Sequence, residues 1–173
     1  ILDDDAMEDY VVSQEIPWYG QRENITKVVI SDGVTKIGED AFSNCTNLSS
    51  VKIPSSVTRI EAWAFFCCES LKEITIPDGI TTIEQSMFTS CEGLEKIILP
   101  NSLKTIAENA LYFTNLSDIY YIGTADEWNE VEIQGEYTID PSNYQMHYCT
   151  RVVASDNICD KNGANNGMYC SDC

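Results

Sequence analysis

The residues best suited to chemistry are cysteines close to the end of the chain. A stretch rich in Asn, Asp and Gly contains Cys149, Cys159, Cys170 and Cys173, and the last two form a C-x-x-C motif. Four thiolates can hold a tetrahedral zinc ion, and His147, the only histidine, could replace one of them. Disulfides would staple the segment equally well outside a cell, and a tail without any staple is the third alternative. The residues leave all three open.

The chain lacks the residue patterns of known catalytic sites. A single histidine near the C-terminus cannot readily serve a nucleophile elsewhere in the chain. No G-x-S-x-G motif, H-E-x-x-H motif or phosphate-binding glycine loop occurs. Carboxylates are plentiful only because the whole chain is acidic. We therefore expect a protein that is not an enzyme.

Three further cysteines recur at a fixed interval. Cys45, Cys68 and Cys91 are spaced by 23 residues, so in a repeating structure their side chains would stack one above another. A thiol metal site or disulfides between neighbouring turns would use this arrangement, but disulfide geometry is demanding and a buried free cysteine is common. The pattern favours a column of small buried thiols on the convex side of a repeat.

The same 23-residue interval governs the aliphatic residues. Repeat units begin at Ile25, Leu48, Leu71, Leu94 and Leu116, the last after an interval of 22 residues. Each unit has two apolar positions two residues apart, which is the spacing of a strand with one buried face, and in most units a proline then ends the strand. A later apolar position returns the chain to the core on a short helical turn. The matched positions are Val28, Val51, Ile74 and Ile97; Ile30, Ile53, Ile76 and Leu99; and Phe42, Phe65, Phe88 and Leu111.

One such unit cannot bury its apolar face alone, so the units must stack. The periodicity predicts an α+β repeat solenoid, a right-handed superhelix with a parallel sheet on one face and short strands and helical turns on the other. Three segments are expected: an N-terminal lead-in and cap (1–24), the repeats with a terminal cap motif (25–136) and a Cys-rich segment (137–173). The abrupt ends indicate a piece of a longer protein.

The unit L-x-x-I-x-I-P-x-x-V-x-x-I-x-x-x-A-F-x-x-C-x-x resembles the BspA-like, or Treponema-type, leucine-rich repeats. Residues 48–93 match it at nearly every position, with Met87 in place of the usual alanine. The fourth unit departs further, because it has Leu111 for phenylalanine and no cysteine. The resemblance implies a leucine-rich-repeat fold in a bacterial cell-surface or secreted protein, of a kind linked to adhesion and to contact with host or matrix proteins.

The two flanks also resemble this family. The segment before the first repeat, with Trp18 and Tyr19, is similar to the lead-in that covers the first turn. Residues 119–133 are similar to the last repeat, which ends the stack. Within them, Thr124 and Glu127 have the spacing of a capping box, so a short helix should begin there and lay Trp128 across the open end.

Charge and hydropathy exclude several classes of partner. The chain has 10 Lys and Arg residues against 28 Asp and Glu residues, which gives a formal net charge of −18. This acidity excludes nucleic acid, whose phosphates require basic patches, and docking on an anionic membrane. No run of 18 apolar residues occurs, so we expect no membrane insertion by this piece of chain.

Two columns of residues should form the solvent side of the sheet. Where positions 51 and 53 of a strand point inward, positions 50 and 52 point outward. This face is the usual place for a solenoid to hold a partner, and Tyr120 is the strongest candidate because aromatic anchors dominate binding hot spots. The columns are Lys27, Ser50, Glu73, Lys96 and Asp118, and Val29, Lys52, Thr75, Ile98 and Tyr120.

These observations together predict a non-catalytic interaction module, extracellular or on a cell surface, that binds a protein or a glycan. A rigid spacer that displays another domain is the first alternative. A metal-binding C-terminal segment is the second, with zinc as its cofactor, and no other cofactor is expected.

Overall fold

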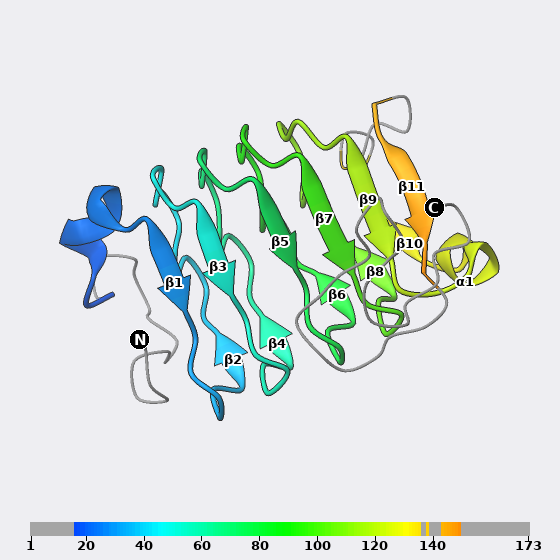
Figure 1. Ribbon diagram of the computed structural model, residues 1–173, viewed down its shortest axis with the longest axis horizontal. Helices are drawn as coiled ribbons and strands as arrows, with labels where there is room; N and C mark the ends of the chain where they lie inside the picture. The colour runs from blue at the N-terminus through cyan, green and yellow to red at the C-terminus, as the bar shows by residue number, and fades with distance from the viewer. Residues whose placement is uncertain (1–15, 136–137, 139–142, 150–173) are drawn as a thin grey trace, which may run out of the picture.

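The computed structural model describes residues 16–135, 138 and 143–149 as a chain wound into successive coils (Figure 1). Each coil adds one strand to a first row and, in most coils, one shorter strand to a second row. The first row comprises β1 (Lys27–Val29), β3 (Ser50–Lys52), β5 (Glu73–Thr75), β7 (Lys96–Leu99), β9 (Asp118–Tyr121) and β11 (Gln145–Tyr148). The second row comprises β2 (Lys36–Ile37), β4 (Arg59–Ile60), β6 (Thr82–Ile83), β8 (Thr105–Ile106) and β10 (Glu132–Ile133).

The paired strands are parallel and lie in the register that the repeat predicts. Lys27 pairs with Ser50, and Glu73 pairs with Lys96, in each case 23 residues apart. Lys96 then pairs with Asp118 after the shorter interval of 22 residues. The sequence period is therefore the length of one coil, and the predicted parallel solenoid is confirmed.

A continuous core runs through the coils. The predicted inward positions are buried in most coils, and Ile37, Ile60, Ile83 and Ile106 are fully buried beneath the second row. The phenylalanines at the equivalent position of three coils stack with ring centroids 5.5–5.6 Å apart, and Trp18 continues the stack at 5.7 Å from the first of them. Each coil thus covers the aromatic ring of its neighbour. The stack is Trp18, Phe42, Phe65 and Phe88.

The helical turns expected at these phenylalanines are absent, and that part of the prediction is wrong. On either side of Phe42, Asp40 and Asn44 have positive φ angles of 58° and 60°, and the same pair of positions is left-handed in the next three coils. A left-handed residue costs a non-glycine side chain about 1–2 kcal/mol and cannot lie inside a right-handed helix. The corner is therefore a tight non-helical turn.

The described residues contain little helix. A 3-10 helix spans Tyr19–Asn24, and the one α-helix, α1, spans Ala125–Asn129. None of the helices in the described part of the chain has the length and apolarity needed to cross a membrane.

Both ends of the coil stack are covered by aromatic residues. At the first end, Trp18 donates a hydrogen bond from Nε1 to the carbonyl of Ala41 at 2.7 Å. At the other end the predicted capping box is present, because the Glu127 N–H donates to Thr124 Oγ1 and the Thr124 N–H donates to Glu127 Oε2. Helix α1 then places Trp128 edge-on against Tyr121, with centroids 5.3 Å apart.

The sheet extends beyond the predicted end of the repeats at residue 136. Strand β11 lies in the segment assigned to the Cys-rich region, yet it pairs in parallel with β9 over four residues. It follows β9 after 27 residues rather than 23, and this longer interval hid it from the repeat pattern. The first row therefore has one strand more than expected.

The aromatic stack supplies a test of the core. We expect Phe65→Ala to lower the free energy of unfolding by about 3–5 kcal/mol, because a buried ring with a neighbour on each face is removed. Phe113→Ala is the matched control, because Phe113 is exposed, and should change the free energy by less than about 0.5 kcal/mol. Urea unfolding followed by circular dichroism measures both. Equal effects would contradict the assigned core.

Candidate functional site

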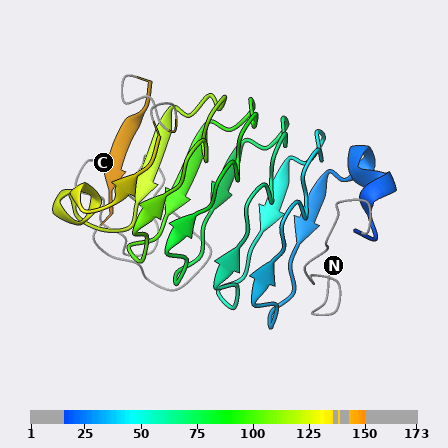
Figure 2. The same ribbon diagram turned by 180° about the vertical axis from the view of Figure 1, so that it is seen from behind.

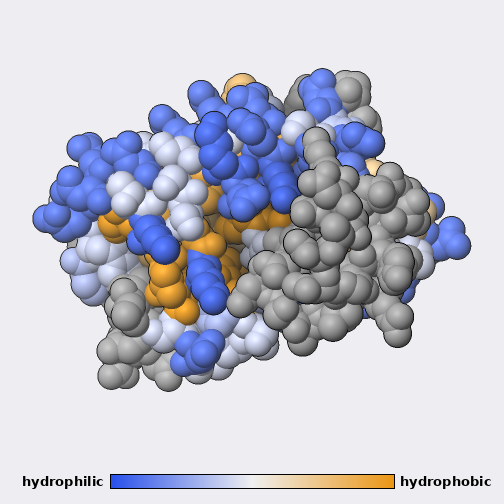
Figure 3. All heavy atoms as spheres, viewed as in Figure 1, coloured by the Kyte–Doolittle hydropathy of each residue, from blue (hydrophilic) through white to orange (hydrophobic). Residues whose placement is uncertain are grey.

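The outward residues of the first row divide into an exposed and a buried part. Along β1, β3 and β5 they are exposed, with Val29 half-buried. Hydrophilic and apolar side chains are mixed on this part of the surface (Figure 3). The exposed members are Lys27, Ser50, Lys52, Glu73 and Thr75.

Two predicted binding residues are buried, and the expectation that they face solvent is wrong. Ile98 is 2% exposed and Tyr120 is 4% exposed, and they form a second small apolar cluster with Cys149. Strand β11 explains part of this, since the ring of His147 stacks on that of Tyr120 with centroids 4.3 Å apart and planes within 8°. Tyr120 is therefore a packing residue rather than an exposed anchor.

The last strands are joined by a polar network that the sequence did not reveal. The imidazole Nε2 of His147 lies 2.8 Å from Oδ1 of Asp118; the His147 side chain is buried and Asp118 is half-buried. Ser117 donates a hydrogen bond from Oγ to the other oxygen of Asp118 at 2.7 Å. The buried Nδ1 of His147 has no hydrogen-bond partner among the described residues. The single histidine thus fastens β11 to β9.

The network continues on the outer face of β7. Lys96 Nζ lies 5.2 Å from the ring centroid of Tyr120 and 3.5 Å from a carboxylate oxygen of Glu73. Lys96 and Asp118 are half-buried, so this half of the predicted face serves mainly to hold strands together. The accessible candidate surface is the part over β1, β3 and β5.

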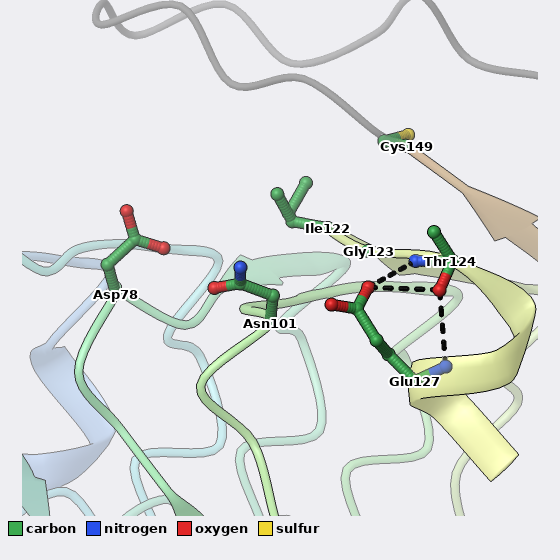
Figure 4. A pocket seen from close by; sticks show the side chains of 7 residues that line it. All are labelled: Asp78, Asn101, Ile122, Gly123, Thr124, Glu127 and Cys149. Carbon is green, nitrogen blue, oxygen red and sulfur yellow. Dashed lines mark hydrogen bonds between the residues drawn. The ribbon is translucent and has the colours of Figure 1, made fainter. Parts of the chain in front are cut away.

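A polar hollow of about 400 Å³ lies beside the turns that follow β5, β7 and β9 (Figure 4). Glu127 Oε2 accepts hydrogen bonds from the N–H and the hydroxyl of Thr124, and these bonds hold the pKa of the Glu127 carboxyl below its usual value. The carboxylate is thereby committed to the helix cap. The lining residues are Asp78, Asn101, Ile122, Gly123, Thr124, Glu127 and Cys149.

The zinc prediction is untested. Cys149 is buried at the end of β11, and Cys159, Cys170 and Cys173 lie outside the described residues. Within residues 16–135, 138 and 143–149, no three His, Cys, Asp or Glu side chains are grouped so that they could hold a metal ion. Any site would therefore need ligands from the remaining residues.

The predicted column of buried thiols is confirmed. Cys45, Cys68 and Cys91 are free and fully buried. Cys68 donates a hydrogen bond from Sγ to the carbonyl of Phe42 at 3.2 Å, and Cys91 donates to the carbonyl of Phe65 at 3.1 Å. The thiols of Cys68 and Cys91 therefore fill small spaces and also donate to a backbone oxygen of the preceding coil.

Burial also makes these thiols unreactive. It raises the pKa of the Cys45 thiol to about 11, against a smaller opposing effect of the Arg22 guanidinium. The neighbouring Cys91 thiol and burial raise the pKa of Cys68 well above its usual value. Since the thiolate is the reactive form, Cys45 and Cys68 have little nucleophilic character near neutral pH.

Alkylation tests this assignment. At pH 8 we expect iodoacetamide to leave Cys45, Cys68 and Cys91 unmodified in the folded protein and to modify all three in guanidinium chloride. Half-buried Cys67 is the internal control and should react faster than Cys68 in the folded state. Tandem mass spectrometry distinguishes the adjacent residues. Modification of Cys68 as fast as that of Cys67 would refute the buried column.

A second test concerns the burial of the Tyr120 ring on the outer side of the first row. We expect Tyr120→Ala to lower the free energy of unfolding by about 3 kcal/mol, because the ring is buried against His147. Thr75→Ala, at the exposed equivalent position, should cost less than about 0.5 kcal/mol. Urea titration of the two variants provides the comparison. A negligible cost for Tyr120→Ala would restore it as a surface residue.

Known proteins share this architecture. A family model described as BspA type leucine rich repeat region matches residues 18–137 in six copies. A leucine rich cell surface protein of Faecalibacterium prausnitzii A2-165 is 36% identical, with a TM-score of 0.51 over 62% of this chain and 32% of its own. A leucine rich repeat protein of T. pallidum is 30% identical, with a TM-score of 0.53 over 57% of this chain and 46% of its own.

A leucine-rich repeat protein of Eubacterium ventriosum ATCC 27560 is 27% identical, with a TM-score of 0.54 over 73% of this chain and 41% of its own. The chain thus spans less than half the length of each of these structures. No curated protein matches it. Because the family model covers most of the coils and the coil-to-coil register agrees with it, the chain belongs to the BspA-type leucine-rich repeat family.

Proposed function

We propose that this protein is a non-catalytic interaction module that binds another protein or a glycan outside a cell, as an adhesion-type surface protein does. The observation that carries the proposal is the accessible outer face of β1, β3 and β5, a row of exposed side chains on successive strands of the first row. Repeat solenoids generally use such extended surfaces to hold partners and are generally non-catalytic. The similarity to a leucine rich cell surface protein supports an extracellular or surface location.

The chemistry of this face favours a partner with both charged and polar groups. Lys27 on β1 and Lys52 on β3 are exposed there although the chain as a whole has a net charge of −18, and Glu73 is exposed on β5. A face with both signs of charge selects partners by complementarity rather than by net attraction. Host or matrix proteins and charged glycans are therefore the partners we would screen first.

Charge reversal on this face tests the proposal. We would screen the purified chain against extracellular-matrix proteins and glycans by biolayer interferometry and then compare variants against the partner found. Lys52→Glu should raise its Kd at least about tenfold, because it places an acidic group at the centre of the face. Lys104→Glu is the matched control, since Lys104 is exposed just before β8 in the second row, and it should leave Kd unchanged.

A partner whose affinity is equal for the wild type and Lys52→Glu would show that the outer face is not the binding surface. Absence of any partner in the screen would favour the second candidate function, a rigid spacer that displays another domain. One observation supports that candidate: with Ile98 and Tyr120 buried, half-buried Val29 is the one apolar side chain left on the outer columns. Metal binding by the C-terminal cysteines stays a separate prediction from the C-x-x-C motif.

A further inference from the structure

The strand pairing is interrupted once in each row, at the same place along the stack. In the first row β1 pairs with β3, and β5, β7, β9 and β11 form a separate sheet. In the second row β2 pairs with β4, and β6, β8 and β10 form a separate sheet. Both interruptions lie between the second and third coils, where Figures 1 and 2 show the ribbons further apart than elsewhere.

Between the second and third coils, the first row lacks the backbone hydrogen bonds that join the other coils. The Ile30 N–H donates to the carbonyl of Lys52 at 3.0 Å, and the equivalent Ile76 N–H donates to Ile98 at 2.9 Å. Between the second and third coils the matching bond would run from Ile53 to Thr75, and it is absent from these fully described segments.

The residues just before the strands of each row also lack backbone hydrogen bonds at this junction. Before the first row, the Ser49 N–H donates to the Thr26 carbonyl at 2.9 Å, and the Glu95 N–H donates to the Lys72 carbonyl at 3.0 Å. The equivalent bond from the Lys72 N–H to the Ser49 carbonyl is absent. Before the second row, the Thr58 N–H donates to the Thr35 carbonyl at 2.9 Å, and the Lys104 N–H donates to the Thr81 carbonyl at 2.8 Å. The equivalent bond from the Thr81 N–H to the Thr58 carbonyl is absent.

One corner holds the second and third coils together. Between residues 63–67 and 85–89 three backbone hydrogen bonds of 2.9–3.2 Å remain, the rings of Phe65 and Phe88 stack, and the Cys91 thiol donates to the carbonyl of Phe65. Beside this corner, Gly93 packs so closely that an added Cβ would lie 2.3 Å from the carbonyl oxygen of Glu69. The coils are thus tightly joined along one edge and unjoined along both rows.

The turn sequences give a physical cause. In the first two coils the Gly33 N–H donates to Ser56 Oγ at 3.1 Å, and that hydroxyl donates to the carbonyl of Val34 at 2.8 Å. Gly79 and Ser102 repeat the arrangement between the third and fourth coils. In the first four coils Asp-Gly turns therefore alternate with serine turns, and a serine hydroxyl ties the first coil to the second and the third to the fourth. At the second junction the later residue is Gly79, which has no hydroxyl to donate backward.

The core is correspondingly more open at this place. Val51 and Ile53 are half-buried, whereas the equivalent side chains of the first and third coils are buried. In Figure 3 apolar residues reach the surface over β1, β3 and β5.

We propose that the junction between the second and third coils is a hinge. Two blocks, β1–β4 and β5–β11, rotate about the corner formed by residues 63–67 and 85–89, which opens and closes the two rows of strands together. Hinges of this kind need a small set of bonded residues that persist while the rest of the interface separates.

Hydrogen exchange of the full chain, followed by NMR, tests the open rows. The amides of Ile53, Lys72 and Thr81 should have protection factors about 100-fold lower than their counterparts in neighbouring coils, Ile76, Glu95 and Lys104. The amides of Phe65 and Cys67, at the joined corner, should stay protected. Protection of Ile53, Lys72 and Thr81 equal to that of their counterparts would overturn the hinge.

Residual dipolar couplings test the motion itself. If the blocks rotate, the N–H couplings of β1–β4 and of β5–β11 require alignment tensors of different magnitude. One tensor that fits both blocks equally well would overturn the proposal.

A matched pair of double variants tests the cause. Asp78→Ser with Gly79→Ser copies the turn of Ser55 and Ser56 and supplies the missing hydroxyl at the hinge, whereas Asp32→Ser with Gly33→Ser makes the same change in the first coil. The first variant should raise the protection of Ile53 and Thr81 at least about tenfold and bring the two tensors together, and the second should do neither. Equal behaviour of the two would remove the turn as the origin of the hinge.

Discussion

No coil of this protein has an interior of its own, and every other feature depends on that constraint. Phe65 is buried because Phe42 and Phe88 cover its two faces, and each of those rings depends in turn on the next. A repeat of constant length keeps such side chains in line, so stability comes from contacts between neighbours rather than from a central core. The ends must then differ from the middle, and Trp18 and Trp128 supply the covers that a further coil would otherwise provide.

The corner of each coil shows how backbone and side chains meet this constraint together. Left-handed residues such as Asp40 and Asn44 turn the chain sharply enough for the phenylalanine between them to point inward. Within the corner the carbonyl of Phe42 accepts a hydrogen bond from the Cys45 N–H at 3.2 Å. The Cys68 thiol of the next coil adds a second donor to the same carbonyl. A small apolar side chain with a weak donor suits this position, which accounts for Cys68 and Cys91 without any redox or metal chemistry.

Periodicity predicted what is repeated and missed what is not. The apolar columns, the parallel register, the buried thiols and the Thr124–Glu127 cap all followed from spacing, because each depends on residues one coil or one helical turn apart. The predicted outward direction of the Tyr120 side chain was also correct. Its burial could not be predicted, because the covering residue, His147, belongs to a strand outside the repeat interval. The corner was mistaken for a helix because its left-handed residues are not glycines, so no residue type marks them. The hinge could not be predicted from the repeat, because the coils on both sides of it match the repeat pattern. It depends on whether serine or glycine occupies the turn position of Gly33, Ser56, Gly79 and Ser102.

The position of the hinge matters for what the outer face can do. Exposed residues lie on both sides of it, with Lys52 on β3 and Thr75 on β5, so a ligand that contacts both bridges the two blocks. Such a ligand binds more tightly to the hinge angle that suits it and must shift the population of angles accordingly. A ligand that contacts only one block binds equally well at every hinge angle and therefore leaves the angle unchanged. The curvature of the solenoid and the occupancy of its face are therefore linked only for partners large enough to span the unpaired strands, which favours a macromolecule over a small ligand on this surface.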